Sequence, residues 1–183
     1  GLKSIIVPSN VKLGGFDFAG CEHLESAILP EGLETIEGIF YGCKNLKSVK
    51  LPNSLKKIGK YAFYRCESLK SINLPENISY IGENAFADSG IESINLPKNL
   101  IEIDSDGFCR TKLKNIIIPN NVKNIKRRAF MESALESITI PSNVEYIGSQ
   151  AFAYCKNLKT VNILGNTTKM STTAFHLSPA SII

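Results

Sequence analysis

A chain of 183 residues is long enough to form one domain with a substantial buried core. Its hydrophobic fraction of 43% and charged fraction of 21% are those of a globular protein and exclude intrinsic disorder. No apolar run approaches the roughly 18 residues of a membrane span, no signal segment opens the chain, and a net charge of +4 is too small to indicate nucleic-acid binding.

Proline recurs along the chain at intervals of 22 or 23 residues, and phenylalanine forms a second series with the same period. A period in this range is typical of leucine-rich solenoids. The first series is Pro8, Pro30, Pro52, Pro75, Pro97, Pro119 and Pro141. The second is Phe18, Phe40, Phe63, Phe86, Phe108, Phe130, Phe152 and Phe175.

Each period opens with a six-residue segment that predicts a short β-strand. The first copy is LKSIIV and the eighth is LKTVNI, and positions one, four and six are apolar in every copy. Alternation around a variable fifth residue is typical of a strand with one buried face. Proline follows seven of the copies and ends the strand, because its nitrogen cannot donate to a ladder. The segments begin at Leu2, Leu24, Leu46, Leu69, Ile91, Leu113, Leu135 and Leu158.

A turn and an apolar arc follow each proline, as in PNSLKKIGKYAF. The third turn position is rich in Asn and Gly, which tolerate a left-handed backbone, so we expect positive φ there. The recurring Ala-Phe pair predicts close packing of successive segments, with Phe filling the core. The arc is too short for a long helix, so we expect a 3₁₀ turn or a single helical turn. The third-position column is Asn10, Gly32, Ser54, Asn77, Asn99, Asn121 and Asn143.

Four of the five cysteines occupy one column, three residues after the repeated Phe. Ser89 and Ser133 take this place in two middle repeats, whereas Cys109 directly follows its Phe. Parallel side chains in a stack leave neighbouring Cβ atoms too far apart for a disulfide, and metal-site spacings such as C-x2-C are absent. We interpret the column as buried free thiols: Cys21, Cys43, Cys66 and Cys155.

The sequence contains no catalytic or phosphate-binding motif. His23 and His176 lie at opposite ends of the repeat series and fit polar surface positions, with a Cys21–His23 dyad as the alternative. We therefore predict that the protein is not an enzyme and uses neither a metal nor a cofactor.

The repeat L-x-S-I-x-[IL]-P-x-N-[VLI]-x-x-I-G-x-x-A-F-x-x-C-x-x-L closely resembles the BspA-like (treponemal) class of leucine-rich repeats, most clearly at 70–100 and 135–158. The resemblance implies an α/β-type repeat solenoid, a right-handed superhelix with one parallel sheet of about eight short strands joined by turns or 3₁₀ arcs. Residues 1–183 are expected to form a single domain of about eight repeats of 22–23 residues, and to be a fragment of a longer surface protein.

The fifth strand position is expected to face solvent, yet it is apolar in three repeats. Variable, partly apolar positions on a repetitive surface are typical of a partner-binding face. Alternatively, exposed β-branched residues merely favour the strand. The predicted partner-binding residues are Ile6, Ile28, Lys50, Asn73, Asn95, Ile117, Thr139 and Asn162.

Charged residues form two further patterns. The second strand position, from Lys3 to Lys159, changes sign at six of seven steps, which favours pairing between neighbouring strands. The densest basic run fits either a solvated face or a site for heparin-like glycans or anionic surfaces. It consists of Lys123, Lys126, Arg127 and Arg128.

From the residues and the resemblance we predict non-catalytic protein–protein recognition, in the form of cell-surface adhesion to host or neighbouring-cell proteins. The expected partner is a protein ligand, such as an extracellular-matrix or surface protein, and the expected location is extracellular or at the cell surface. Nucleic-acid binding and membrane insertion are not expected. The alternative function is a structural spacer or stalk that displays another domain.

Overall fold

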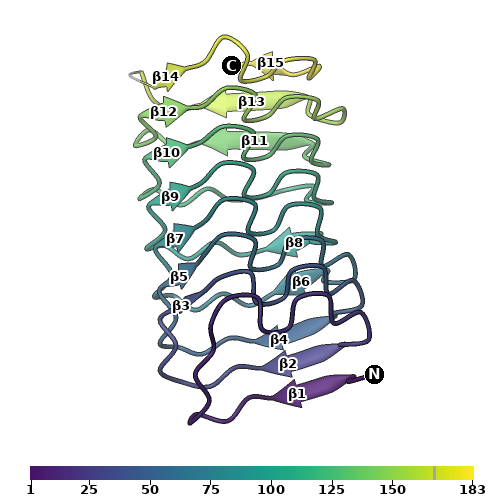
Figure 1. Ribbon diagram of the computed structural model, residues 1–183. Helices are drawn as coiled ribbons and strands as arrows, with labels where there is room; N and C mark the ends of the chain where they lie inside the picture. The colour runs from purple at the N-terminus through teal and green to yellow at the C-terminus, as the bar shows by residue number, and fades with distance from the viewer. Residues whose placement is uncertain (167) are drawn as a thin grey trace.

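In the computed structural model, the chain winds into a stack of about eight coils joined by parallel strand pairing (Figure 1). The structure describes residues 1–166 and 168–183, and none of these residues lies in a helix. Coils are numbered from the strand segments, so coil 1 starts at Leu2 and coil 8 at Leu158. The predicted repeat solenoid is confirmed.

The predicted strand segments lie together on one side of the stack, which we call the strand face (Figure 1). They pair in three separate ladders, β1-β2-β4, β6-β8 and β11-β13-β15, rather than in the single sheet expected. Coil 6 contributes no strand to this face, and β15 follows coil 8. The strands are β1 (Ser4–Ile6), β2 (Ser26–Ile28), β4 (Ser48–Lys50), β6 (Ser71–Ile72), β8 (Ser93–Ile94), β11 (Ser137–Ile140), β13 (Thr160–Ile163) and β15 (Ser181–Ile182).

A second parallel sheet, which the repeat pattern did not lead us to expect, runs along another side of the stack (Figure 1). Its seven strands pair without interruption in the order β14-β12-β10-β9-β7-β5-β3. In most coils the inner residue is a buried isoleucine, such as Ile58 or Ile81. The strands are β3 (Thr35–Ile36), β5 (Lys57–Ile58), β7 (Tyr80–Ile81), β9 (Glu102–Ile103), β10 (Asn124–Ile125), β12 (Tyr146–Ile147) and β14 (Lys169–Met170).

The arcs that carry the phenylalanines are turns, one of the two forms implied by the resemblance, whereas the expected 3₁₀ or single helical turn does not occur in the described chain. Along each arc, bonds within the turn, such as Tyr64 N–H to Tyr61 O at 3.2 Å, alternate with bonds from one coil to the next. Phe40 N–H donates to Ala62 O at 3.1 Å, and Phe63 N–H donates to Ala85 O at 2.8 Å. Because these N–H groups are directed to the next coil, they are not available for the bonds within a helical turn.

The prediction of positive φ in the asparagine column is also wrong, since Gly32 is its only member in the left-handed region. The asparagine amides instead reach the preceding coil: Asn77 Nδ2 donates to Asn53 O at 2.9 Å, and Asn121 Nδ2 donates to Lys98 O at 2.8 Å. The left-handed residues flank the repeated Phe, two residues before or after it. The non-glycine members are Phe16, Tyr61, Arg65, Asn84, Asp88, Asp106, Arg110, Arg128, Glu132, Gln150, Tyr154 and Leu177.

The eight repeated phenylalanines form a continuous stack of rings through the core. Centroids of neighbouring rings are 5.1–5.8 Å apart, and from Phe63 onward the ring planes lie within 8° of parallel. The six inner rings, Phe40 to Phe152, are fully buried. The expectation that Phe fills the core is therefore confirmed.

Small residues beside the rings let the coils approach closely, as the Ala-Phe pattern predicted. Ala62 and Ala85 are fully buried. A Cβ on Gly82 would lie 2.9 Å from Gly59 C, and a Cβ on Gly148 would lie 2.7 Å from Lys126 C. No side chain fits at either glycine without movement of the neighbouring backbone.

Phe108→Ala removes a ring from the centre of the stack, between Phe86 and Phe130 at 5.3 and 5.4 Å. We expect the free energy of unfolding in urea to fall by about 3–5 kcal/mol, because both neighbours lose packing contacts and a cavity remains. Ile101→Ala, at a side chain that is 54% exposed, is the control and is expected to cost less than about 0.5 kcal/mol. Similar losses in the two variants would contradict a ring stack that carries the core.

Gln150 has φ of 57°, so substitutions there test the left-handed columns. We expect Gln150→Val to lower the free energy of unfolding by about 1–2 kcal/mol relative to Gln150→Gly, because a β-branched side chain is strained at positive φ and glycine is not. Thermal unfolding of the two variants gives the comparison. Equal melting temperatures would contradict the left-handed backbone at this position.

Candidate functional site

Seven of the eight residues predicted for partner binding are exposed on the strand face, and Asn162 is half-buried. Strand pairing places Ile6 beside Ile28 and Ile28 beside Lys50 in one ladder. In another ladder Thr139 lies beside Asn162. The apolar members are open to solvent, with exposed fractions of 73% for Ile6 and 86% for Ile117. The remaining members are Asn73 and Asn95, which directly follow β6 and β8.

The strand-face ladders divide this row of residues into groups. The first break, between β4 and β6, coincides with the one like-charge step in the second strand position, from Lys47 to Lys70. Like charges on adjoining strands repel each other. Each lysine instead pairs away from the break, Lys47 Nζ with Glu25 at 2.7 Å and Lys70 Nζ with Glu92 at 3.4 Å. Lys47 lowers the pKa of the Glu25 carboxyl through its hydrogen bond and its charge.

The second break is coil 6, and it creates two hollows on the strand face. One, of 750 Å³, is lined by residues that include Asn95, Leu96 and Ile117. The other, of 320 Å³, is lined by residues that include Ile117, Thr139 and Leu164. Ile117 therefore stands between two depressions. The repeat pattern identified Ile117 but not Leu96 or Leu164. The only signal for Leu164 was that it replaces the strand-ending proline in coil 8.

The thiols are free and mostly buried, in agreement with the interpretation of the cysteine column. Their role is more specific than apolar packing, because three of them donate to the carbonyl of the Phe one coil earlier. Cys43, Cys66 and Cys155 Sγ reach Phe18, Phe40 and Phe130 O at 3.0–3.2 Å. Ser178 occupies the same column and its Oγ donates to Phe152 O at 2.6 Å. These four donors therefore satisfy carbonyls beside the ring stack.

The basic run is largely neutralised by carboxylates from neighbouring coils. Lys123 Nζ lies 3.2 Å from Glu145, and Arg128 Nη2 lies 3.0 Å from Asp106. Lys126 contacts Glu102 at 2.9 Å and also Asp104. Arg127 has no ion-pair partner within the described residues, and it borders a hollow of 380 Å³. The glycan-binding alternative for this run stays an untested prediction.

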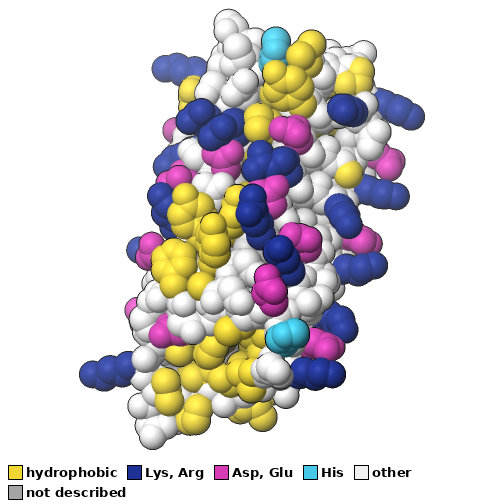
Figure 2. All heavy atoms as spheres, turned by 45° about the vertical axis from the view of Figure 1, so that its right-hand side comes forward, with side chains coloured by type: hydrophobic (Ala, Val, Ile, Leu, Met, Phe, Trp, Pro, Cys, Tyr) yellow, Lys and Arg dark blue, Asp and Glu magenta, His cyan; other side chains and the backbone are white. Residues whose placement is uncertain are grey.

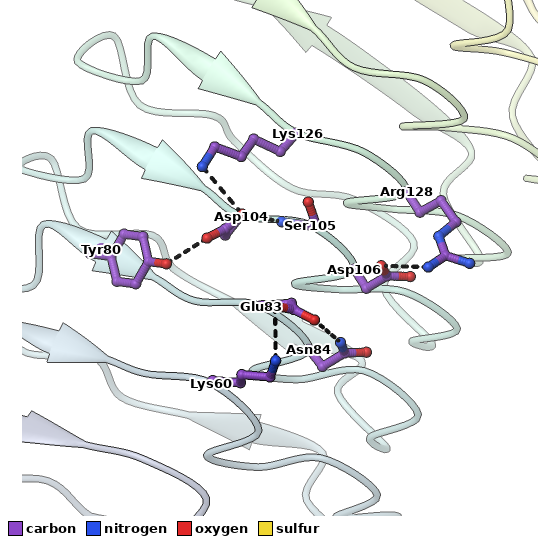
Figure 3. A network of polar contacts seen from close by, with 9 residues as sticks. All are labelled: Lys60, Tyr80, Glu83, Asn84, Asp104, Ser105, Asp106, Lys126 and Arg128. Atoms are coloured by element: carbon purple, nitrogen blue, oxygen red, sulfur yellow. Dashed lines mark hydrogen bonds and ion pairs between the residues drawn. The ribbon is translucent and has the colours of Figure 1, made fainter.

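Figure 3 shows two of these ion pairs, Lys126 with Asp104 and Arg128 with Asp106, among polar contacts that cross the coils. Asp104 lies at the centre of these contacts, accepting a hydrogen bond from Tyr80 Oη and another from Ser105 N–H. Partial burial opposes ionisation of Asp104, but these bonds and the charge of Lys126 outweigh it, so the pKa of the carboxyl is lowered. These contacts align successive coils.

We call the side of the stack formed by the phenylalanine-containing turns the loop side. A cluster of aromatic side chains that no sequence motif had indicated lies there, in coils 1–3. Tyr41 and Tyr64 stack at a centroid distance of 5.1 Å, and Phe16 and Tyr61 pack against Tyr41 at 5.9 Å. The guanidinium of Arg65 lies over Tyr64 at 5.4 Å. Figure 2 shows the loop side, where hydrophobic side chains gather mainly in the N-terminal half beside a band of mixed charges.

The described residues contain no cluster of three or more His, Cys, Asp or Glu side chains placed to hold a metal ion. Within the same residues, no helix is long and apolar enough to cross a membrane. His23 and His176 are both exposed. His176 packs edge-on against Tyr154 at 5.6 Å.

Comparison with known proteins identifies one family model that matches the chain, the BspA type leucine rich repeat region, with six copies over residues 1–111 and 81–182. Leucine-rich repeat proteins generally bind other proteins and are generally non-catalytic. No protein of curated function matches the chain in sequence.

Crystal structures of bacterial leucine-rich repeat proteins share the fold. The T. pallidum leucine-rich repeat protein superposes with a TM-score of 0.73 at 27% identity, over 85% of this chain and 77% of that chain. A Bacteroides ovatus leucine-rich repeat protein has a TM-score of 0.63 at 21% identity, and the match covers 98% of this chain but only 63% of that chain. A leucine rich cell surface protein from Faecalibacterium prausnitzii has a TM-score of 0.50 at 20% identity, over 100% of this chain and 72% of that chain.

Alkylation of the native protein with iodoacetamide at pH 8 tests the thiol column. Burial raises the pKa of the Cys43 thiol to about 11 and that of Cys109 to about 12, so both are protonated and shielded, and the thiolate is the reactive form. We expect mass spectrometry to find Cys21, which is half-buried, alkylated first. Under denaturing, non-reducing conditions all five cysteines should react. A single reactive thiol in the unfolded chain would contradict free thiols.

Proposed function

Since the chain belongs to the BspA-type leucine-rich repeat family, we propose that it recognises other proteins, without catalysis, through the exposed residues of its strand face. The observation that carries the proposal is the alignment of Ile6, Ile28 and Lys50 at adjoining positions of one ladder, with Ile6 73% and Ile28 39% exposed. Covering exposed apolar side chains is favourable in water. A row of them with varied polar neighbours suits a protein partner.

We further propose that this recognition is adhesion at the cell surface, to host or neighbouring-cell proteins or to extracellular-matrix proteins. The name of the Faecalibacterium prausnitzii neighbour, a cell surface protein, supports this location. The structural neighbours share the repeat architecture, and the varied strand-face residues of this chain would determine its partner. A spacer or stalk would need no such varied and partly apolar row.

The proposal is tested by surface plasmon resonance of the purified chain over a panel of immobilised extracellular-matrix proteins. We expect saturable binding to at least one of them. Saturable binding would reject a spacer that binds nothing, whereas no binding to any member of the panel would count against adhesion to the matrix.

Three substitutions made together, Ile28→Ser, Lys50→Ser and Asn73→Ser, test the strand face itself. We expect them to raise the Kd for a matrix partner at least about tenfold, because they remove exposed contact residues from three successive coils of the strand face. The matched control is Ile101→Ser, Lys57→Ser and Asn157→Ser, which changes exposed residues of the same types outside the strand face. An unchanged Kd for the strand-face triple would place binding elsewhere on the protein.

A further inference from the structure

Coil 6 differs from its neighbours in that most of its strand segment is not hydrogen-bonded to them: Lys114 O accepts a bond from Glu136 N–H at 3.0 Å, and the pairing stops there. Residues 113–118 read LKNIII and lie between β8 and β11 in the stack. Within the described chain, no backbone hydrogen bond joins 115–118 to coil 5 or coil 7. Backbone N–H and C=O groups require partners, from protein or from water. This segment therefore presents unpaired backbone groups on the strand face.

Ile117 is the most prominent apolar side chain at this break. Its exposed fraction of 86% is the highest among the large hydrophobic residues described. The hollows of 750 and 320 Å³ lie on its two sides and share Asn115, Ile116 and Ile117 in their linings. A ligand that contacts Ile117 therefore has a depression available on either side of it.

The linings are almost uncharged. Ile94, Ile116 and Ile138 are 3–8% exposed and give the hollows apolar floors. The side-chain amides of Asn95 and Asn115 stand beside them, exposed. The charged lining residues are Glu76 and Lys98, both exposed and both in the larger hollow. Burying a charged group in such a site is costly, whereas apolar groups flanked by amides match it. The complementary ligand carries apolar side chains and peptide-like hydrogen-bonding groups.

The spacing of the hollows fits an extended chain that crosses the coils. Parallel strands stack about 4.8 Å apart, so depressions on either side of one coil have centres roughly 5–10 Å apart. In an extended polypeptide, side chains two residues apart lie on one face, about 6.6 Å from each other. Residues i and i+2 of such a segment can therefore enter the two hollows while the residue between them points away.

We propose that coil 6 is an anchoring site for an uncharged, extended segment of a partner protein, with two apolar side chains two residues apart placed on either side of Ile117. This assignment rests on the proposed recognition through the strand face and specifies the chemistry of the partner. The amides of Asn95 and Asn115 bind the backbone of the segment.

The test titrates ¹⁵N-labelled protein with two blocked peptides of identical composition, acetyl-GSISISG-amide and acetyl-GSIISSG-amide. In the second peptide the isoleucines are adjacent and project to opposite faces. We expect the first peptide to shift the amide signals of 94–98, 115–118 and 138–140 in a saturable manner. We expect the second to bind at least about tenfold more weakly, because it buries only one isoleucine.

Variants locate the binding. Ile117→Lys should abolish the shifts, whereas Ile101→Lys, at an exposed isoleucine away from the strand face, should leave them unchanged. Equal shifts with both peptides, no shifts with either, or shifts that survive Ile117→Lys would overturn the proposal. If the strand-face triple variant loses matrix binding while neither peptide shifts the signals of coil 6, protein recognition by the strand face is supported and the anchoring site at coil 6 is rejected. If the peptides bind coil 6 as expected and no matrix protein binds, the anchoring site is supported and adhesion to the matrix is rejected.

Discussion

The stacking of each coil on the next is the interaction on which the rest of the structure depends. A single coil of 22 or 23 residues cannot enclose its own apolar side chains, so its stability comes from its neighbours. Two kinds of contact join the coils. The phenylalanine rings stack at 5.1–5.8 Å through the core, and backbone hydrogen bonds such as Phe40 N–H to Ala62 O link the arcs around it. At the surface, ion pairs and hydrogen bonds of asparagine amides also link each coil to its neighbours.

This dependence explains why the sequence predicted the architecture well. Every coil must place an apolar residue, a small residue and a turn at the same positions around the coil. This requirement appears in the sequence as columns of similar residues with one period. Phe86 and Ala85 are buried as their columns predicted. The strand-face residues were predictable for the same reason, because alternation in a strand separates Ile28, which is exposed, from Ala27, which is buried.

What the sequence did not reveal depends on contacts between coils rather than on local preference. The left-handed positions include Arg65 and Tyr154, residue types with no preference for that conformation. These residues adopt the left-handed conformation in arcs whose N–H groups bond to the next coil, as Arg65 N–H does to Ala87 O. Coil 6 shows the opposite case. Its III sequence has high strand propensity, yet it forms no strand, because residues 115–118 make no backbone hydrogen bonds with either neighbouring coil. Leu164 reaches the hollow beside Ile117 only through the departure of coil 8 from the repeat.

The two sets of strands give the array mechanically unequal sides. The second sheet is hydrogen-bonded without interruption from β3 to β14, whereas on the strand face no ladder joins β4 to β6 and residues 115–118 of coil 6 make no backbone hydrogen bond to either neighbouring coil. Bending that opens the strand face breaks no ladder bond at these places, whereas bending in the reverse direction must stretch the continuous sheet. The solenoid is therefore stiff in one direction and compliant in the other. Its curvature can adjust at the positions where the exposed isoleucines would meet a partner.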